Sequence, residues 1–204
     1  IWYTSVLPVG GDHVTSDIAV GMRTPMSNAE RIKIQHGCAT SSLIDENEKI
    51  EILDTSGKKK QTISRKMLYN IIEPRVDEIF DLVQKEIKKA GYDGLIPAGV
   101  VVTGGASLLD GIPELVSNKL NMSVRVGVPD NMDGLLEYLD GSIYDIGEGY
   151  SQFSEENGAI FSTGVGLVKY GAETFADDSV DEVNNEAEVG DLLDKVKGFF
   201  KDIF

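Results

Sequence analysis

The run GVVVTGGASLLDGIPELVSNKLN, residues 99–121, constrains the fold of this chain more than any other segment. Its valines indicate a buried strand, its glycines a turn, and the apolar positions that follow a helix. Strand, glycine turn and helix form the unit that builds parallel sheets, which bind ligands at the carboxyl ends of their strands. The run SVRVGVP at residues 123–129 predicts the next strand. We therefore expect an α/β fold.

The glycine turn at Gly104, Gly105 and Ser107 is a candidate ligand site. Glycines let a nucleotide approach the backbone, and a helix amino end favours an anion. The turn lacks the lysine of a P-loop and the spacing of a dinucleotide fingerprint. A turn with no ligand is the commoner explanation of such a sequence. Glu30 and Lys33, three residues apart on one helical face, suit either a solvated ion pair or hydrogen bonds to a ribose and an adenine.

The amino-terminal residues predict a strand followed by two helices. Residues 2–9 alternate like a strand, and Asp12 or Thr15 can cap a first helix. Ser27 and Glu30 predict a capping box at the start of the second helix, which ends at Gly37. The first helix carries one apolar face, made of Val14, Ile18 and Met22. His13 is interpreted as a capping or packing residue, because no Ser or Cys has the sequence context of a nucleophile.

The middle of the chain changes pattern twice. Residues 38–63 contain the short runs ATSSLI, EKIEIL and KQTIS, which predict a small sheet. Residues 64–90 have the longest helical periodicity, and Pro74 predicts a kink there or two helices meeting near Glu73. Residues 130–157 have little periodicity and predict a surface loop, with a short helix near Leu135 to Leu139. The run AIFSTGVGLVKYG that follows predicts a closely packed helix.

Charge and composition exclude several classes of protein. With 34 acidic and 19 basic residues the formal net charge is -15, so a nucleic-acid partner would need a basic patch that the sequence does not contain. The single cysteine, Cys38, cannot form an internal disulfide, which favours a reducing compartment. The two histidines and this cysteine have no zinc-site spacing, so no metal site is expected. No uninterrupted apolar run reaches the roughly 18 residues that would suggest a membrane span.

The carboxyl-terminal residues combine an acidic stretch with an amphipathic helix. Residues 173–188 contain seven acids and no Lys or Arg, which predicts a flexible linker. Residues 189–204 carry apolar side chains along one helical face. These include Leu192, Leu193, Val196, Phe199, Phe200, Ile203 and Phe204. Such a face can dock on the protein itself, pair with a partner helix or lie in a membrane interface. Its acids and lysines cancel, so electrostatic attraction to anionic lipid is not expected.

The motifs become specific in combination. LPVGGDHVTSDIAVGM, AERIKIQHG, IIEPRVDEIFDLV, VVTGGASLLDGIPEL and STGVGLVKYG occur in this order, before the acidic stretch and the terminal helix. This series closely resembles the carboxyl-terminal half of FtsA, the actin-like bacterial cell-division protein family. The resemblance implies a ribonuclease-H-like subdomain made of residues 1–37 and 97–172. It also implies a small inserted α+β subdomain at residues 38–96.

The resemblance further implies ATP and Mg²⁺ as cofactors. In this reading Gly11 lies near the phosphates, and Glu30 and Lys33 contact ribose and base. Gly104, Gly105 and Ser107 form the adenosine motif. The family's phosphate motifs precede a segment like WYTSVLPVGGD and are absent from this sequence. We therefore expect half of a nucleotide cleft, with weak or no ATP binding by the chain alone and at most weak ATPase activity at full length.

Partners are also implied by the resemblance. The inserted subdomain would bind the tail of FtsZ through Arg75, with Arg65, Lys66 and Asn70 as secondary candidates. The alternative is that Arg75 pairs only with Glu73 or Glu78. Self-association into filaments and attachment of the last helix to the cytoplasmic face of the cell membrane are expected too. Two other functions stay open: an ATPase or kinase of the actin and sugar-kinase superfold, and a regulator that binds a partner groove through its last helix.

Overall fold

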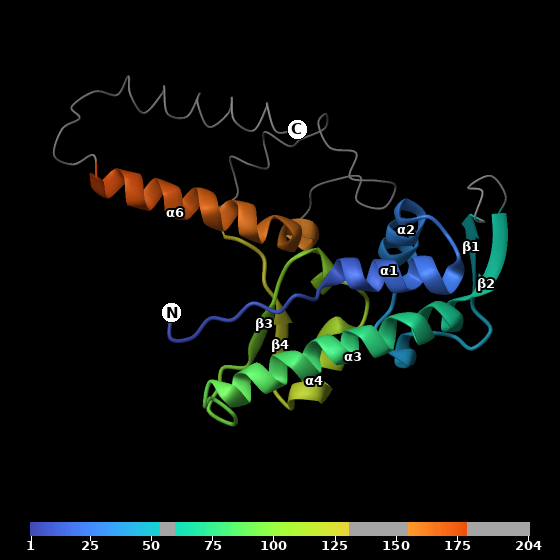
Figure 1. The fold of residues 1–204 in the computed structure, drawn as a ribbon, viewed down its shortest axis with the longest axis horizontal. Helices are drawn as coiled ribbons and strands as arrows, with labels where there is room; N and C mark the ends of the chain where they lie inside the picture. Colours follow the sequence, from blue (N-terminus) through green and yellow to red (C-terminus); the bar gives the residue numbers. More distant parts are fainter. Residues whose placement is uncertain (54–59, 131–154, 179–204) are drawn as a thin grey trace, which may run out of the picture. The chain divides into compact units, whose positions relative to one another are not determined.

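The computed structural model describes residues 1–53, 60–130 and 155–178. Its contacts divide the chain into two units, Ile1–Thr163 and Gly164–Phe204, which we describe separately. The first unit is a mixed α/β assembly of helices and two small sheets (Figure 1). The expected separation of residues 38–96 from 1–37 and 97–172 stays a prediction.

The strand, turn, helix and strand predicted from residue 99 onward are confirmed. Strand β3 (Val100–Val102) pairs in parallel with β4 (Val124–Val126), with Val100 opposite Val124. The prediction that the first strand is buried is wrong: Val101 is 52% exposed, and β4 is the one described strand that pairs with β3. Between them come a short 3-10 turn, η2 (Gly105–Leu108), and helix α4 (Ile112–Leu120). Helix α4 buries residues four apart, Ile112, Val116 and Leu120. The turn therefore lies at the carboxyl end of β3, where a ligand site was expected.

Helix α1 (Gly11–Met22) buries the predicted face of Val14, Ile18 and Met22. The predicted cap at Asp12 or Thr15 is wrong, because the helix starts earlier and Gly10 is its N-cap. His13 has the predicted capping role: its Nδ1 accepts a hydrogen bond of 3.2 Å from the Gly10 N–H. This contact satisfies a backbone donor at the helix start.

Two further amino-terminal predictions are wrong. Helix α2 (Met26–His36) follows Pro25 with no side-chain cap, so Ser27 lies inside its first turn and forms no capping box. Pro25 is the N-cap residue, and it lacks the backbone N–H that the acidic residue of a capping box would satisfy. Residues 1–10 form no strand, because none of the described strands pairs with them. The helix end predicted at Gly37 is confirmed.

The small sheet and the long helix are both present in the middle of the chain. Strands β1 (Lys49–Leu53) and β2 (Lys60–Ser64) are antiparallel, with Ile50 opposite Ile63. The run ATSSLI is not a strand; it contains the 3-10 turn η1 (Ser41–Leu43). Helix α3 (Arg65–Lys89) continues across Pro74, so two helices do not meet there, and the alternative of a kink at Pro74 stays a prediction. The buried residues Ile72 and Val76 on either side anchor the helix and offset the hydrogen bond that proline removes.

The core of the first unit lies where α1, α2, α3 and α4 meet the two sheets. Its fully buried members include Ile18 of α1, Ala29 of α2, Leu68 and Ile72 of α3, and Val116 of α4. In Figure 1, α1 lies beside the first part of α3, and the two helices contact each other. Helix α3 therefore connects the β1–β2 sheet at its start with the region of β3 and β4.

The last described elements are η3 (Glu155–Phe161) and helix α6 (Ser162–Asp178). The helix predicted for AIFSTGVGLVKYG is confirmed, and its close packing stays a prediction. Because α6 continues to Asp178, the linker expected from residue 173 does not begin there. The predictions for residues 131–154, for the linker after residue 178 and for the helix at 189–204 lie outside the described residues. In the part of the chain that is described, no helix has the length and apolar character needed to cross a membrane.

Candidate functional site

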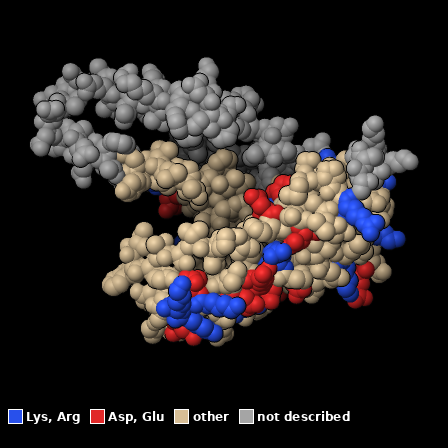
Figure 2. Space-filling model, in the orientation of Figure 1, with Lys and Arg blue, Asp and Glu red and all other residues tan. Residues whose placement is uncertain are grey.

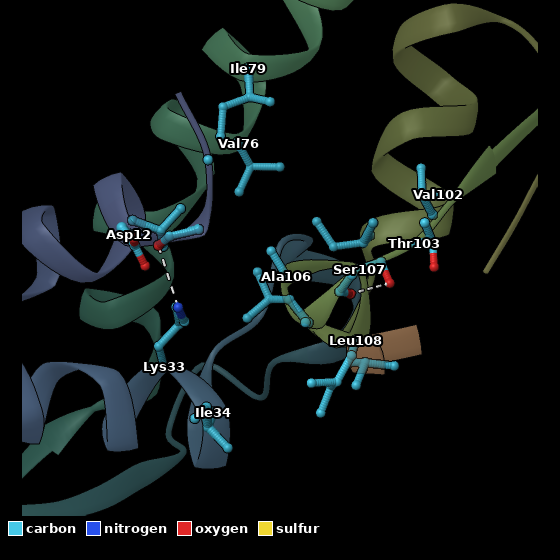
Figure 3. A pocket seen from close by; sticks show the side chains of 18 of the residues that line it. Asp12, Lys33, Ile34, Val76, Ile79, Val102, Thr103, Ala106, Ser107 and Leu108 are labelled. Carbon is cyan, nitrogen blue, oxygen red and sulfur yellow. Dashed lines mark hydrogen bonds between the residues drawn. The ribbon is translucent and has the colours of Figure 1, made fainter. Parts of the chain in front are cut away.

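A pocket of about 770 Å³ opens within the first unit, between the start of α1, helices α2 and α3, and the turn after β3 (Figure 3). All six residues proposed as nucleotide contacts line it: Gly11, Glu30, Lys33, Gly104, Gly105 and Ser107. They come from three separate segments of the chain. The fold therefore places the two weakest sequence signals, the glycine turn and the Glu30 and Lys33 pair, at one site.

Lys33 is the central polar group of the pocket. Its ammonium donates to Thr15 Oγ1 at 2.9 Å and to the Gly11 carbonyl at 3.3 Å, and pairs with Glu30 Oε2 at 2.7 Å. Its side chain is 11% exposed. An ammonium has three N–H donors, and each has a protein partner here. Lys33 therefore holds α1 and α2 together, and a hydrogen bond to a base would require one of these contacts to open.

Glu30 remains open to a ligand. Its Oε2 accepts from both Lys33 and the Thr15 hydroxyl. Its side chain is 42% exposed, and Oε1 has no hydrogen-bond partner among the described residues. A carboxylate oxygen fixed in this way can accept hydrogen bonds from a diol such as a ribose. Glu30 is thus better suited than Lys33 to direct ligand contact.

Thr15 does not line the pocket but supports two residues that do, whereas the sequence indicates only a helix cap. It is 3% exposed and bridges Lys33 and Glu30 through its hydroxyl. The available signal was its position beside Val14 and before Ile18, on the buried face of α1. A hydroxyl at such a position needs a hydrogen-bond partner.

The glycine turn provides space for a ligand. Gly104 has φ +90°, a conformation that L side chains rarely adopt, and a Cβ at this position would meet nothing within 4 Å. Its N–H donates to the Ala159 carbonyl at 3.0 Å, and its carbonyl accepts from the Ser107 hydroxyl at 2.7 Å. Ser107 therefore stabilises the turn, and Gly104 offers close approach to the backbone without a free N–H for an anion.

One wall of the pocket is apolar and was not assigned to the site from the sequence. Helix α3 contributes Val76, Ile79, Phe80 and Val83, and Figure 3 shows Val76 and Ile79 above the space between Lys33 and the glycine turn. Their helical spacing is that of an ordinary core face. Apolar walls with a few polar groups are the usual lining of small-molecule pockets.

A family model described as "Cell division protein FtsA" matches residues 1–166. This chain belongs to the FtsA family. It is 40% identical over 177 residues to FtsA of Pseudomonas aeruginosa, covering 87% of the chain and 38% of that protein. FtsA of Escherichia coli K12 is 34% identical over 194 residues, covering 92% of the chain and 40% of the relative. FtsA of Bacillus subtilis is 36% identical over 164 residues, covering 80% of the chain and 36% of the relative.

The chain thus spans about two fifths of the length of these FtsA relatives. Among solved structures it is similar to MreB5 of Spiroplasma citri bound to AMPPNP. That similarity has a TM-score of 0.48 and 23% identity, and covers 59% of this chain and 39% of MreB5. The pocket and the FtsZ candidates on α3 all lie within the matched residues 1–166.

Three of the four FtsZ candidates differ in how firmly the protein holds them. Arg65 is 16% exposed and donates to the His36 carbonyl, Glu48 and Asp110, so it ties α3 to the surrounding loops. Lys66 pairs with Glu46 at 3.4 Å on the surface. Asn70 is exposed, one helical turn after Lys66. Lys66 and Asn70 are therefore accessible, whereas Arg65 has a structural role.

Arg75, the main FtsZ candidate, is held by two carboxylates. Its Nε and Nη2 donate to Asp17 at 2.6 and 3.2 Å, and its Nη1 donates to Glu78 at 2.5 Å. The hydrogen bonds to Asp17 are the main reason that the pKa of Arg75 is raised. Glu78 was considered as a partner from the sequence, but Asp17 was not. Figure 2 shows that acidic and basic side chains also lie next to one another elsewhere on the face of the molecule that it draws.

Proposed function

We propose that this FtsA-family chain contributes one half of an actin-like ATP-binding cleft in a cell-division protein. The observation that carries the proposal is the convergence of six expected contacts, from three segments, on one pocket. Its volume of about 770 Å³ lies within the range of about 300–1,000 Å³ that is usual for small-molecule sites. The other half of the cleft and the phosphate motifs would come from a part of the protein that this sequence does not contain.

The main residues at the pocket have separate chemical roles in this proposal. Glu30 accepts hydrogen bonds from the ribose, and Lys33 and Thr15 fix its carboxylate. The apolar wall of α3, including Phe80, covers the base, and Gly104 lets the adenosine approach the backbone. Gly11 lies on the side of the phosphates, whose bound Mg²⁺ would neutralise their charge. Because chemistry at the phosphates needs groups outside this chain, we propose at most weak ATPase activity for the complete protein.

Isothermal titration of the chain with Mg-ATP tests the half-cleft proposal. We expect affinity far weaker than micromolar, with a dissociation constant of about 1 mM, or about -4 kcal/mol, because only one side of the nucleotide is contacted. ADP and adenosine should bind with similar affinity, since the phosphates find few partners here. Micromolar affinity for ATP would contradict the proposal, because it would mean that this chain alone forms a complete site.

We also propose that α3 binds the tail of FtsZ and so links FtsZ filaments to this protein. An acidic tail with apolar residues needs cations beside apolar contacts. Lys66, Asn70 and the 48% exposed Met67 lie on the first half of α3, and Arg75 follows five residues after Asn70. The observation that favours this function is that accessible polar and apolar side chains occur together on one helix.

Attachment to the cytoplasmic face of the cell membrane completes the proposed scaffold, together with self-association into filaments. The residues that would insert, Leu192 to Phe204, lie outside the described part of the chain, so this proposal rests on their amphipathic sequence. A single such helix binds weakly, and a filament would add many weak contacts. Vesicle flotation of the chain with and without residues 189–204 tests this: equal flotation of both would exclude the helix as the membrane contact.

A further inference from the structure

The guanidinium of Arg75 lies next to more negative charge than it can neutralise. Asp17 and Glu78 both contact it, so one positive and two negative charges give the cluster a net charge of -1. A guanidinium has five N–H donors, and Nε, Nη1 and Nη2 each use one in these contacts. An approaching acidic peptide therefore meets a negatively charged cluster and not a free cation.

The two carboxylates are not equivalent. Glu78 lies three residues after Arg75 on the same helix, and its side chain is 55% exposed. Asp17 comes from α1, is 32% exposed, and contacts Arg75 with both of its oxygens. This two-point contact is the arrangement in which arginine binds a free carboxylate. Asp17 thus occupies the edge of Arg75 that would best bind a carboxylate of a partner.

We infer that Asp17 is an intramolecular competitor for an acidic peptide at Arg75, so that the Asp17–Arg75 contact must open before the peptide binds there. This inference rests on the proposed function of α3 in binding the FtsZ tail, and it names the regulation of that site. Affinity at Arg75 then depends on how α1 sits against α3, and not on the peptide alone.

The position of Asp17 connects the competitor to the pocket. Asp17 lies two residues after Thr15, and both belong to the single helix α1. Lys33 holds this helix at its start through the Gly11 carbonyl and through Thr15. The carboxylate that blocks Arg75 is therefore carried by an element whose first turn lines the proposed nucleotide site.

The test measures binding of a fluorescently labelled FtsZ tail peptide to the whole chain by anisotropy. Asp17→Asn should bind the peptide about fivefold more tightly, because the peptide no longer has to break the ion pair between Asp17 and Arg75. Asp81→Asn is the matched control. Asp81 lies on α3, pairs with Lys119 at 2.9 Å and has a side chain that is 48% exposed. Its replacement by Asn removes the same charge as Asp17→Asn without changing a contact of Arg75. The affinity of the Asp81→Asn variant for the peptide should stay within about twofold of that of the unmodified chain.

Unchanged or weaker binding by Asp17→Asn would overturn the inference, as would tighter binding that appears only in Glu78→Gln. Arg75→Gln separates this failure from that of the proposed function. If Arg75→Gln binds as well as the unmodified chain, Arg75 is not part of the tail site. If Arg75→Gln weakens binding and Asp17→Asn does not strengthen it, the tail site stands and only the competitor is wrong.

A second measurement needs no substitution and so does not depend on the folding of any variant. Saturating the unmodified chain with the peptide should shift the carbon NMR signal of the Asp17 side-chain carboxyl group, because the peptide then binds Arg75 in place of Asp17. The side-chain carboxyl signal of Asp77, which pairs with Lys119 at 2.6 Å, provides the internal reference and should not move. A stationary Asp17 signal at saturation would also overturn the inference.

Discussion

Replacing Arg75 by Glu is expected to weaken binding of the FtsZ tail at least about tenfold relative to the unmodified chain. Loss of a charge-assisted hydrogen bond to the peptide alone weakens binding by about tenfold. The new carboxylate would also join Asp17 and Glu78, so three negative charges would face an acidic peptide. Fluorescence anisotropy with a labelled tail peptide measures the effect.

Lys85→Glu is the control for this charge reversal, because Lys85 is an exposed residue ten positions further along α3. It should change the affinity by no more than about twofold, since exposed charges at this separation are largely screened. Thermal unfolding of each variant checks that Arg75→Glu remains folded, and Arg75→Gln provides a milder change if it does not. Unchanged binding by folded Arg75 variants would place the contact elsewhere on the protein.

Replacing Leu68 by Ala is expected to lower the free energy of unfolding by about 3 kcal/mol. Leu68 is fully buried, and α3 packs there against α1 and the small sheet. Removing a buried leucine side chain costs about 2–5 kcal/mol through lost burial and the cavity that remains. Urea unfolding followed by circular dichroism measures the change.

Met67 provides the comparison, because it precedes Leu68 on the same helix and is 48% exposed. Met67→Ala should change the free energy of unfolding by no more than about 0.5 kcal/mol. If both substitutions had the same small effect, α3 would not pack in the core as described. The pair therefore tests the orientation of the helix that also forms the apolar wall of the pocket.

Local patterns in the sequence predicted most of the secondary structure. The apolar spacing of residues 64–90 predicts α3 almost to its ends, and the valines and glycines after Gly99 predict β3 and its turn. The failures have local causes as well. Residues 2–9 have the alternation of a strand, but a strand forms only with a neighbour, and no described strand pairs with them. Ser27 has the spacing of a cap, but the helix already starts at Met26, directly after Pro25.

Contacts between distant residues could not be predicted from such patterns. Arg75 and Asp17 are 58 positions apart, and an aspartate on the exposed side of a helix gives no sign of its partner. In the sequence, Thr15 has the pattern of a helix cap. Its hydrogen bond with Lys33 could not be predicted, because that contact depends on how α1 and α2 pack. The wall formed by Val76 and Phe80 has the spacing of any buried helix face. The six pocket residues came from the family resemblance, and spacing alone left their roles undecided.

Backbone amide NMR during a titration with Mg-ATP tests the central claim, that this chain carries one half of a nucleotide site, most directly. The account predicts that the largest shifts occur at Gly11, Gly104 and Gly105, and that they saturate only at millimolar ATP. Val124 and Val126 of β4, which do not line the pocket, should shift little. Absence of shifts at the three glycines at millimolar ATP, or larger shifts elsewhere in the chain, would contradict the account.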